Sequence, residues 1–236
     1  AGCEVAFHDR SMPDHADAIF THDPVIVIDE GAILLRMGKR LRRGEEAAIG
    51  KTLENLGIPI FAALEGEATA EGGDLLWLDH DTLAVGRGYR TNGEGFRQLN
   101  AVLRPLGVET VEVQLPHGGG PSACLHLMSL VSMLDHDLAV AFLPLLPVPF
   151  IELLTARGIE LVEVPAEELP TMGPNVLALA PRCCLMLEGN PVTRKRLENA
   201  GCEVLTYRGE ELSLKAEGGA TCLTRPILRS TTPLTP

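Results

Sequence analysis

The sequence predicts an α/β protein built from five similar modules that close into a ring. The chain has 236 residues, of which 45% are hydrophobic and 22% charged, so it can bury the core of a globular domain. The pentapeptide Ala-Gly-Cys-Glu-Val occurs at positions 1–5 and again at 200–204. A predicted helix followed by glycine and a β-type run recurs about every fifty residues, a period typical of repeat architectures.

Glycine marks the end of each predicted repeat helix, because it readily adopts the left-handed conformation that follows a helix C-terminus. A short run of β-forming residues comes directly after each of these glycines. The five positions are Gly2, Gly57, Gly107, Gly158 and Gly201, which are 55, 50, 51 and 43 residues apart.

Two apolar runs around a tight turn predict a β-hairpin between successive glycines. A helix should follow each hairpin, most clearly where Asn190 is an N-cap residue and Pro191 the first helical residue of a segment that runs to Ala200. The predicted hairpins pair 25–29 with 32–36, 75–78 with 82–85, 130–134 with 138–142, and 176–179 with 184–187.

The start of the chain corresponds to the end of a repeat helix. By the repeat period, we expect the first module to lack its hairpin and helix, or roughly 30 to 40 residues of the natural chain. Residues 1–236 should then form one domain with a truncated N-terminal module. The alternative is that the matches arise by chance, since a helix, a glycine and a strand follow one another in many α/β proteins.

Charge and cysteine content exclude several classes of function. With 32 acidic and 20 basic residues the formal net charge is −12, which disfavours nucleic acid and favours a small cationic ligand. No apolar run approaches the roughly 18 residues of a membrane span, and no signal peptide opens the sequence. The six cysteines form no CxxC pattern and are expected to be reduced, as in a cytoplasmic protein.

Polar residues recur in the loop that follows each predicted glycine-led strand. Equivalent loops of a radial repeat meet near its axis, so these side chains should share one site. A thiol, an imidazole and several carboxylates predict nucleophilic catalysis with proton transfer. The residues are Asp17 and Asp23, Glu71 and Asp74, His126, Asn175, and Cys222.

The surplus of carboxylates over what one histidine requires implies that the ligand is itself cationic. A planar guanidinium is the cation that two carboxylates hold with directional hydrogen bonds. Its carbon is a poor electrophile, so orientation beside a thiolate is needed, and its charge would lower the pKa of the thiol.

Six ordered motifs between about Phe7 and Arg225 resemble those of the dimethylarginine dimethylaminohydrolases. This family belongs to the pentein superfamily, together with arginine deiminases and amidinotransferases. The motifs are Asp17-Ala-Ile-Phe-Thr-His-Asp23, Arg42-Arg-Gly-Glu45, Glu71-Gly-Gly-Asp74, Arg90-Thr-Asn92, Leu125-His-Leu127 and Gly218-Gly-Ala-Thr-Cys222.

The resemblance implies a five-bladed α/β propeller whose central channel binds a substituted arginine. It implies that Cys222 attacks the guanidinium carbon and that His126 protonates the leaving amine and then activates water. Glu71 would orient His126 and help to hold the cation. The products would be citrulline and an alkylamine, with neither metal nor organic cofactor.

The resemblance also assigns residues to the two ends of the substrate. Asp23 would bind guanidinium nitrogens and Asp17 would lie near the α-amino group. Arg42 and Arg90 would hold the α-carboxylate.

Two residues depart from the patterns of the related families. His22 stands where dimethylargininases have glutamate, which would alter recognition of the amine end. Met128 stands where arginine deiminases have aspartate, so a free NH2 would lose an acceptor there while N-methyl groups would be tolerated. The sequence therefore favours an alkylated guanidine over free arginine.

Other interpretations remain open from the sequence. The same site suits an arginine deiminase or an amidinotransferase, and some penteins are non-catalytic binding proteins. Cys124, His126 and Cys222 could in principle chelate zinc, although a fourth ligand is missing. The sequence does not decide whether the protein forms a homo-oligomer.

Overall fold

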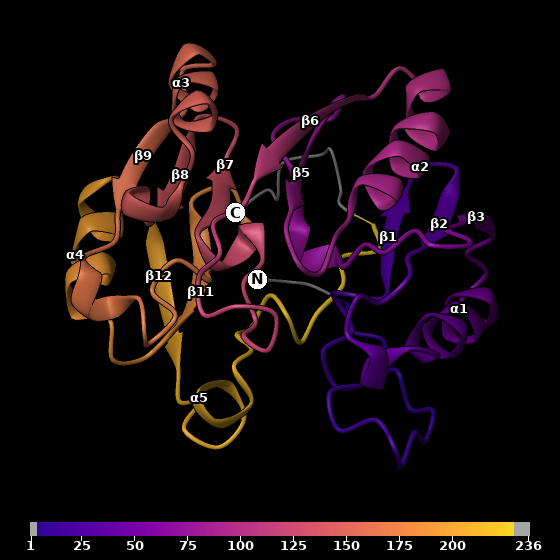
Figure 1. Ribbon diagram of the computed structural model, residues 1–236. Helices are drawn as coiled ribbons and strands as arrows, with labels where there is room; N and C mark the ends of the chain where they lie inside the picture. The colour runs from indigo at the N-terminus through magenta and orange to yellow at the C-terminus, as the bar shows by residue number, and fades with distance from the viewer. Residues whose placement is uncertain (1–3, 229–236) are drawn as a thin grey trace.

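The computed structural model describes residues 4–228 and contains four small three-stranded sheets (Figure 1). In each sheet the first two strands form an antiparallel hairpin and the third pairs parallel with the second. The strands are β1 (Val25–Ile28), β2 (Gly31–Leu34) and β3 (Ile60–Ala63); β4 (Leu75–Trp77), β5 (Thr82–Arg87) and β6 (Glu109–Gln114); β7 (Val131–Asp135), β8 (Leu138–Ala141) and β9 (Glu160–Glu163); and β10 (Leu177–Ala180), β11 (Cys183–Leu187) and β12 (Glu203–Tyr207).

A helix connects the second and third strand of every sheet, as a parallel pairing requires. Each of these helices leads to a predicted glycine with positive φ: Gly57 at 81°, Gly107 at 84°, Gly158 at 75° and Gly201 at 85°. The connecting helices are α1 (Glu45–Asn55), α2 (Gly93–Leu103), α3 (Val148–Ala156) and α4 (Pro191–Asn199), and the short α5 (Ser213–Ala216) follows β12. The hairpin, helix and glycine-led strand are thus confirmed in four modules.

The prediction of a fifth glycine-led strand at the start of the chain is not borne out in the described residues. Residues 1–3, including Gly2, lie outside them, and Glu4 and Val5 belong to no strand. One local detail also differs. Asn190 precedes α4 as predicted, but its side chain does not cap the helix. Instead the carboxylate of Glu168 accepts hydrogen bonds from the backbone N–H groups of Val192 and Thr193, each at 2.8 Å.

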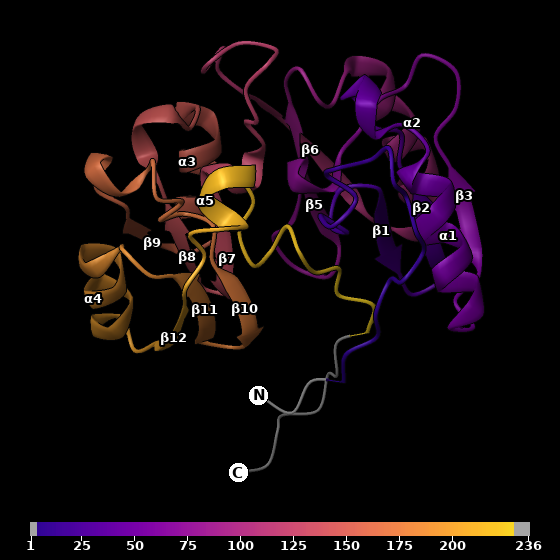
Figure 2. The same ribbon diagram turned by 90° about the horizontal axis from the view of Figure 1, so that it is seen from below.

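Neighbouring modules pack through the first strands of their hairpins. Strand β7 contacts β4 on one side and β10 on the other. Helices α1 and α2 lie on one side of the molecule and α3 and α4 on the other (Figure 2). The modules are therefore arranged side by side, with their hairpins turned toward one another.

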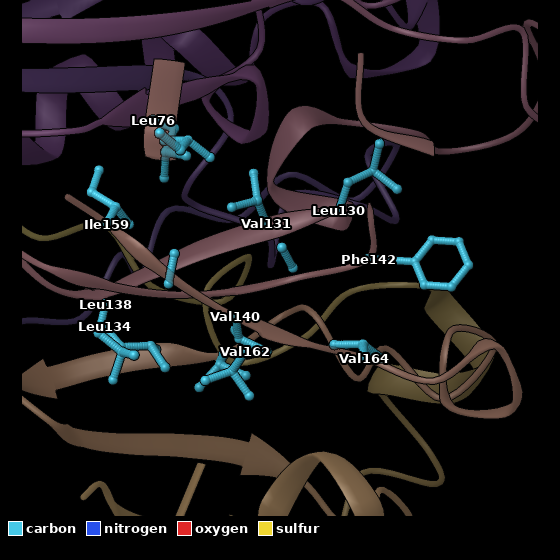
Figure 3. Packing of buried hydrophobic residues seen from close by; sticks show 14 of the residues in the cluster. Leu76, Leu130, Val131, Leu134, Leu138, Val140, Phe142, Ile159, Val162 and Val164 are labelled. Carbon is cyan, nitrogen blue, oxygen red and sulfur yellow. The ribbon is translucent and has the colours of Figure 1, made fainter. Parts of the chain in front are cut away.

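The largest apolar cluster runs through the second, third and fourth modules (Figure 3). It includes Leu76 of β4, Val131 of β7, Val140 of β8 and Val162 of β9. Complete burial of one such side chain contributes roughly 1.5–3 kcal/mol. Leu127, which has no exposed surface, belongs to the same cluster and anchors the loop that carries His126.

Within residues 4–228, no helix has both the length and the apolar character needed to cross a membrane.

Candidate active site

Six of the predicted site residues line one pocket between the modules. They come from loops that precede or follow strands, and the pocket is also lined by Phe20, Lys39, Ser122, Cys124 and residues 216–218. Glu71 lies beneath this pocket and has no exposed surface. The six residues are Asp17, Asp23, Arg42, Arg90, His126 and Cys222.

The buried pair of Glu71 and His126 forms the base of the pocket. Glu71 immediately precedes a short 3-10 turn (Gly72–Asp74), and His126 immediately precedes another (Leu127–Ser129). His126 Nε2 donates to Glu71 Oε2 at 2.8 Å. A Cβ atom on Gly73 would lie only 2.5 Å from His126 Nδ1, so glycine is required there for the imidazole to reach its position.

The charge of Glu71 and the charge of His126 each stabilise the ionised form of the other residue. Burial alone would raise the pKa of Glu71, but the hydrogen bond and charge of His126 hold it below its usual value. Burial alone would lower the pKa of His126, yet the neighbouring acidic groups Cys124, Asp23 and Asp74 hold it well above 6.5. The imidazole is thus a cation at neutral pH. Its Nδ1 lies 3.7 Å from Cys124 Sγ and is not engaged by Glu71.

Asp74 is a site residue whose role the sequence left unassigned. It has no exposed surface, and its carboxylate accepts from Thr91 Oγ1 at 2.6 Å and from the backbone N–H of Leu127 at 2.9 Å. Burial raises its pKa to about 6, although the charge of His126 and these two hydrogen bonds favour the ionised form. By holding Leu127, Asp74 fixes the turn that begins at His126. The sequence signal for Asp74 was its position three residues after Glu71 in the Glu-Gly-Gly-Asp motif.

The three side chains of the Arg90–Asn92 segment make three different sets of contacts. Arg90 Nη1 lies 3.4 Å from Glu71 Oε2, and Nη2 donates to the carbonyl oxygen of Ala123 at 3.3 Å. Thr91 binds Asp74 as described above. Asn92 is the N-cap of α2 and accepts from the backbone N–H of Gly95 at 2.8 Å. The Arg90 Nε atom is buried and has no hydrogen-bond partner among residues 4–228.

Asp23 and Arg42 are paired with each other in this structure. Arg42 Nη1 donates to Asp23 Oδ2 at 2.6 Å, and Nη2 donates to Glu45 Oε2 at 2.8 Å. Burial would raise the pKa of Asp23, but His126 and Arg42 hold it at about 2. The carboxylate predicted to bind a substrate guanidinium therefore already binds a guanidinium of the protein.

The second oxygen of Asp23 faces the second module. Asp23 Oδ1 accepts from the backbone N–H of Gly73 at 2.9 Å, and the Asp23 carbonyl accepts from Gly72 N–H at 2.9 Å. These bonds join the loop before β1 to the turn between Glu71 and β4. They fix Asp23 close to His126.

Asp17 lies at the mouth of the pocket rather than at its base. Lys39 Nζ donates to Asp17 Oδ2 at 2.5 Å, and both side chains are partly exposed. The backbone N–H of Lys39 donates to Glu71 Oε1 at 3.0 Å, so the same residue touches the base and the mouth. Nothing in the sequence motifs indicated Lys39.

Cys222 follows α5 and is half-buried. Its sulfur accepts a hydrogen bond from Asn175 Nδ2 at 3.5 Å. Burial, reinforced by the nearby Asp23 carboxylate, raises the pKa of the thiol to about 11. At neutral pH Cys222 is therefore a thiol in the same pocket as an imidazolium, and it needs further positive charge to ionise.

His22 is buried but does not line the pocket. Its Nδ1 lies 2.8 Å from the carbonyl oxygen of Thr224 and must be the donor. Burial and the cation of Arg225 lower the pKa of His22 to about 3, so the ring is neutral. Its backbone N–H donates to the carbonyl of Cys222 at 3.2 Å, which joins the first module to the C-terminal segment that carries Cys222. Met128 packs against the large apolar cluster and does not line the pocket.

The zinc alternative from the sequence finds no geometric support in the described residues. There the donors of Cys124, His126 and Cys222 do not gather within 4.8 Å of one another. Asp23, Glu71 and His126 do, but Arg42 already binds Asp23 and His126 binds Glu71.

The fold and the pocket together define an α/β repeat protein with a cysteine, histidine and carboxylate site between its modules. A family model described as arginine deiminase matches residues 7–148 and 146–229. The chain belongs to this arginine deiminase family.

The curated relatives include enzymes of two different names. The N(G),N(G)-dimethylarginine dimethylaminohydrolase of Streptomyces coelicolor is 35% identical over 211 residues, which cover 89% of this chain and 74% of the relative. The protein of the same name from Pseudomonas aeruginosa is 28% identical over 207 residues, covering 88% and 75%. Arginine deiminase of Listeria welshimeri is 26% identical over 253 residues, covering 89% and 61%.

Solved structures confirm the predicted fold class, an α/β propeller of the pentein type. A cysteine-to-serine mutant of Pseudomonas aeruginosa dimethylarginine dimethylaminohydrolase, complexed with citrulline, matches with a TM-score of 0.74 and 27% identity over 89% of this chain and 76% of that one. The N-terminal domain of a cyanobacterial arginine dihydrolase matches with a TM-score of 0.79 and 22% identity, covering 92% and 80%. This second likeness is one of fold.

Proposed function

We propose that this protein hydrolyses substituted guanidines and converts N-omega-methylated arginine to citrulline and an alkylamine. The observation that carries the proposal is the buried hydrogen bond from His126 to Glu71 beside the half-buried thiol of Cys222. A charged imidazole held by a carboxylate is a proton donor ready for a leaving amine. The relatives named dimethylarginine dimethylaminohydrolase support this choice of substrate.

In the first half-reaction the Cys222 thiolate forms a bond to the guanidinium carbon. The bond from that carbon to the alkylated nitrogen then breaks, and His126 supplies the proton with which the amine departs. Because Glu71 holds Nε2, Nδ1 is the nitrogen available for this transfer. The remaining adduct is a thiouronium ion on Cys222.

In the second half-reaction water attacks the thiouronium carbon. The neutral His126 left by the first step accepts one proton from this water, the carbon–sulfur bond breaks, and the second proton of the water passes to solvent as citrulline and the thiolate are released. His126 is thus again an imidazolium, and the thiolate takes up a proton from solvent once no cation is bound. The charge on Glu71 favours imidazolium at both ends of the cycle.

Ionisation of Cys222 depends on the substrate in this scheme. The pKa of the thiol is about 11, so little thiolate exists at neutral pH. A bound guanidinium brings a second cation next to the sulfur and lowers that pKa. The nucleophile is therefore formed when substrate binds, and the thiol proton passes to solvent.

The carboxylates and arginines of the pocket would hold the two ends of the substrate. Asp23 receives the guanidinium in exchange for its present bond to Arg42, which leaves Arg42 free to approach the α-carboxylate together with Arg90. Asp17, at the mouth, binds the α-amino group. No metal or organic cofactor enters this scheme.

The choice of an alkylated substrate over free arginine rests on the relatives named dimethylarginine dimethylaminohydrolase. Met128 and His22, which the sequence suggested as the residues that select an alkylated guanidine, do not line the pocket and carry no part of this choice.

A product assay tests the proposal. The protein is incubated with dimethylarginine, with arginine, and with arginine plus glycine, and citrulline, dimethylamine, ammonia and guanidinoacetate are measured. We expect citrulline and dimethylamine from dimethylarginine, and loss of both in Cys222→Ser. The matched control is Cys183→Ser in β11, which does not line the pocket and should retain activity. No turnover of any guanidine would overturn the proposal.

Arginine deiminase is the second candidate, favoured by the family model and by the relatives of that name. It would release ammonia from arginine faster than dimethylamine from dimethylarginine in the same assay. An amidinotransferase would instead form guanidinoacetate when glycine is added. We place the enzyme in the cytoplasm, in accord with the thiols of Cys124, Cys184, Cys202 and Cys222.

A further inference from the structure

The sulfur of Cys222 is held by two neutral hydrogen-bond donors that belong to different parts of the chain. Asn175 Nδ2 lies 3.5 Å from Sγ and comes from the loop before β10. The backbone N–H of Gly219 also donates to this thiol. Neither donor has a part in the reaction scheme described so far.

Asn175 is fixed in place by its own backbone and by the neighbouring module. Its side chain is buried, with 8% of the residue exposed. Its N–H donates to the carbonyl of Met172 at 2.9 Å. The hydroxyl of Ser132, in β7, donates to the Pro174 carbonyl at 2.7 Å and lies 3.3 Å from the N–H of Val176. The residues on both sides of Asn175 are therefore tied to the third module.

Glycine at position 219 allows the amide to approach the nucleophile segment. A Cβ atom on Gly219 would lie 2.2 Å from Asn175 Oδ1, a distance that no side chain tolerates. Residue 219 must lack a side chain to leave room for Asn175, and its backbone N–H is the second donor to the sulfur. The two glycines before Ala220 thus have a local reason beyond loop flexibility, since Gly218 similarly leaves room for the ring of Phe20.

The donors oppose an unfavourable charge near the sulfur. Asp23 is anionic at neutral pH and disfavours a thiolate beside it, whereas His126 favours one. A thiolate accepts hydrogen bonds more strongly than a thiol does, because a bond to a charged acceptor is roughly twice as strong as a neutral one. Two preoriented donors therefore stabilise the ionised sulfur selectively.

We propose that Asn175 is a catalytic residue which, together with the backbone N–H of Gly219, stabilises the Cys222 thiolate both as attacking and as leaving group. This inference rests on the proposed function only in taking Cys222 as the nucleophile. The thiolate is a reactant in the first half-reaction and a leaving group in the second, so the same two donors act twice in each turnover. No atom or electron is transferred to Asn175.

The expected magnitude follows from the thiolate fraction and its nucleophilicity. Loss of the Asn175 donor should raise the pKa of Cys222 by about one unit, which lowers the thiolate fraction at neutral pH about tenfold. The more basic thiolate is about threefold more nucleophilic, given a Brønsted coefficient of about 0.4–0.5. The net loss in alkylation rate at neutral pH is therefore about threefold.

The test measures the pH dependence of alkylation of Cys222 by iodoacetamide, with the modified peptide quantified by mass spectrometry. Asn175→Ala removes the donor, and Asn175→Asp keeps the shape while replacing the donor by a carboxylate. We expect the thiol pKa to rise by about one unit in the first variant and further in the second. The control is Asn190→Ala, a buried asparagine of the same module whose amide donates to the carbonyl oxygens of Thr171 and Leu187.

An unchanged thiol pKa in a folded Asn175 variant would overturn the inference, and so would an equal rise in Asn190→Ala. Circular dichroism establishes which variants are folded. If Asn175→Ala does not fold, the isosteric Asn175→Asp decides the question alone. The measurement needs no substrate, so failure to form citrulline would count against the proposed function and leave this inference standing.

Discussion

The ion pair at the base of the pocket is buried, whereas the ion pair at its mouth is partly exposed to solvent. At the base, Glu71 and His126 are almost wholly buried and joined at 2.8 Å. At the mouth, Asp17 and Lys39 are joined at 2.5 Å but remain partly exposed. Water and salt screen the outer pair, whereas the inner pair cannot be solvated if one partner is lost. Similar contacts therefore have unequal consequences, with rigid geometry at the base and adjustable attraction at the mouth.

A change at the base should have the largest effect on catalysis. Glu71→Gln keeps the size of the side chain but removes the charge that stabilises the imidazolium. We expect kcat for citrulline formation to fall by about 10²–10⁴-fold, and the pKa that governs the His126 limb of the pH profile to fall. A pH–rate profile of both proteins measures this. A Gln variant with wild-type kcat would contradict the role of the base.

Removal of the buried arginine should cost stability. Arg42→Ala leaves Asp23 and Glu45 as buried carboxylates without their cation, which typically costs about 3–5 kcal/mol. Urea unfolding measures the difference. The matched control is Arg194→Ala, whose exposed pair with Glu198 on α4 should contribute about 0.5 kcal/mol or less. Equal losses of unfolding free energy in the two variants would contradict the expected difference between buried and exposed ion pairs.

Asp74 should make stability depend on pH in the acid range. Its folded pKa of about 6 lies above the usual value of 3.8, so the folded protein binds this proton more tightly than the unfolded chain. Its contribution to stability is present below pH 3.8 and is lost as the pH rises through about 6, a loss on the order of 3 kcal/mol.

The variant that removes this titration is Asp74→Asn, which retains an oxygen to accept from Leu127 N–H. The difference in unfolding free energy between the variant and the wild type should grow in favour of the variant from pH 4 to pH 7. Unfolding by urea at several pH values gives this difference. Parallel pH curves would show that Asp74 is not the titrating group.

The smallest effect is expected at the mouth. Asp17→Asn should raise KM up to about fivefold and leave kcat unchanged, because an exposed ion pair is worth about 1 kcal/mol or less. The rise should shrink at high salt. Steady-state kinetics at two ionic strengths measure both features. A fall in kcat would mean that Asp17 contributes to the chemical step, as Glu71 and His126 do.

The repeat was predictable because its signals are local. A glycine after a helix and two apolar runs around a turn depend on neighbouring residues, and four modules formed as expected. The convergence of Asp23, His126 and Cys222 followed from equivalent positions in the repeat. The opening strand was not formed by Glu4 and Val5, since sequence identity with 200–204 cannot supply the hairpin with which β12 pairs.

The partners within the pocket could not be predicted, because they depend on how loops that are separated along the chain fold against one another. The bond of Arg42 to Asp23 and that of Lys39 to Asp17 join residues 19 and 22 positions apart. A sequence motif indicates that an arginine or a lysine is present, but it does not show which of several carboxylates that side chain contacts. Asn175 illustrates the same limit, since its distance from Cys222 emerges only when the fourth module lies against the C-terminal segment.

The most direct test is to trap the covalent intermediate. The wild-type protein is mixed with dimethylarginine, quenched in acid during the first turnovers and digested, and each cysteine peptide is weighed by mass spectrometry. We expect a thiouronium adduct on the peptide that contains Cys222, and its absence in Cys222→Ser. An adduct on another cysteine, or citrulline formed by Cys222→Ser at the wild-type rate, would contradict it.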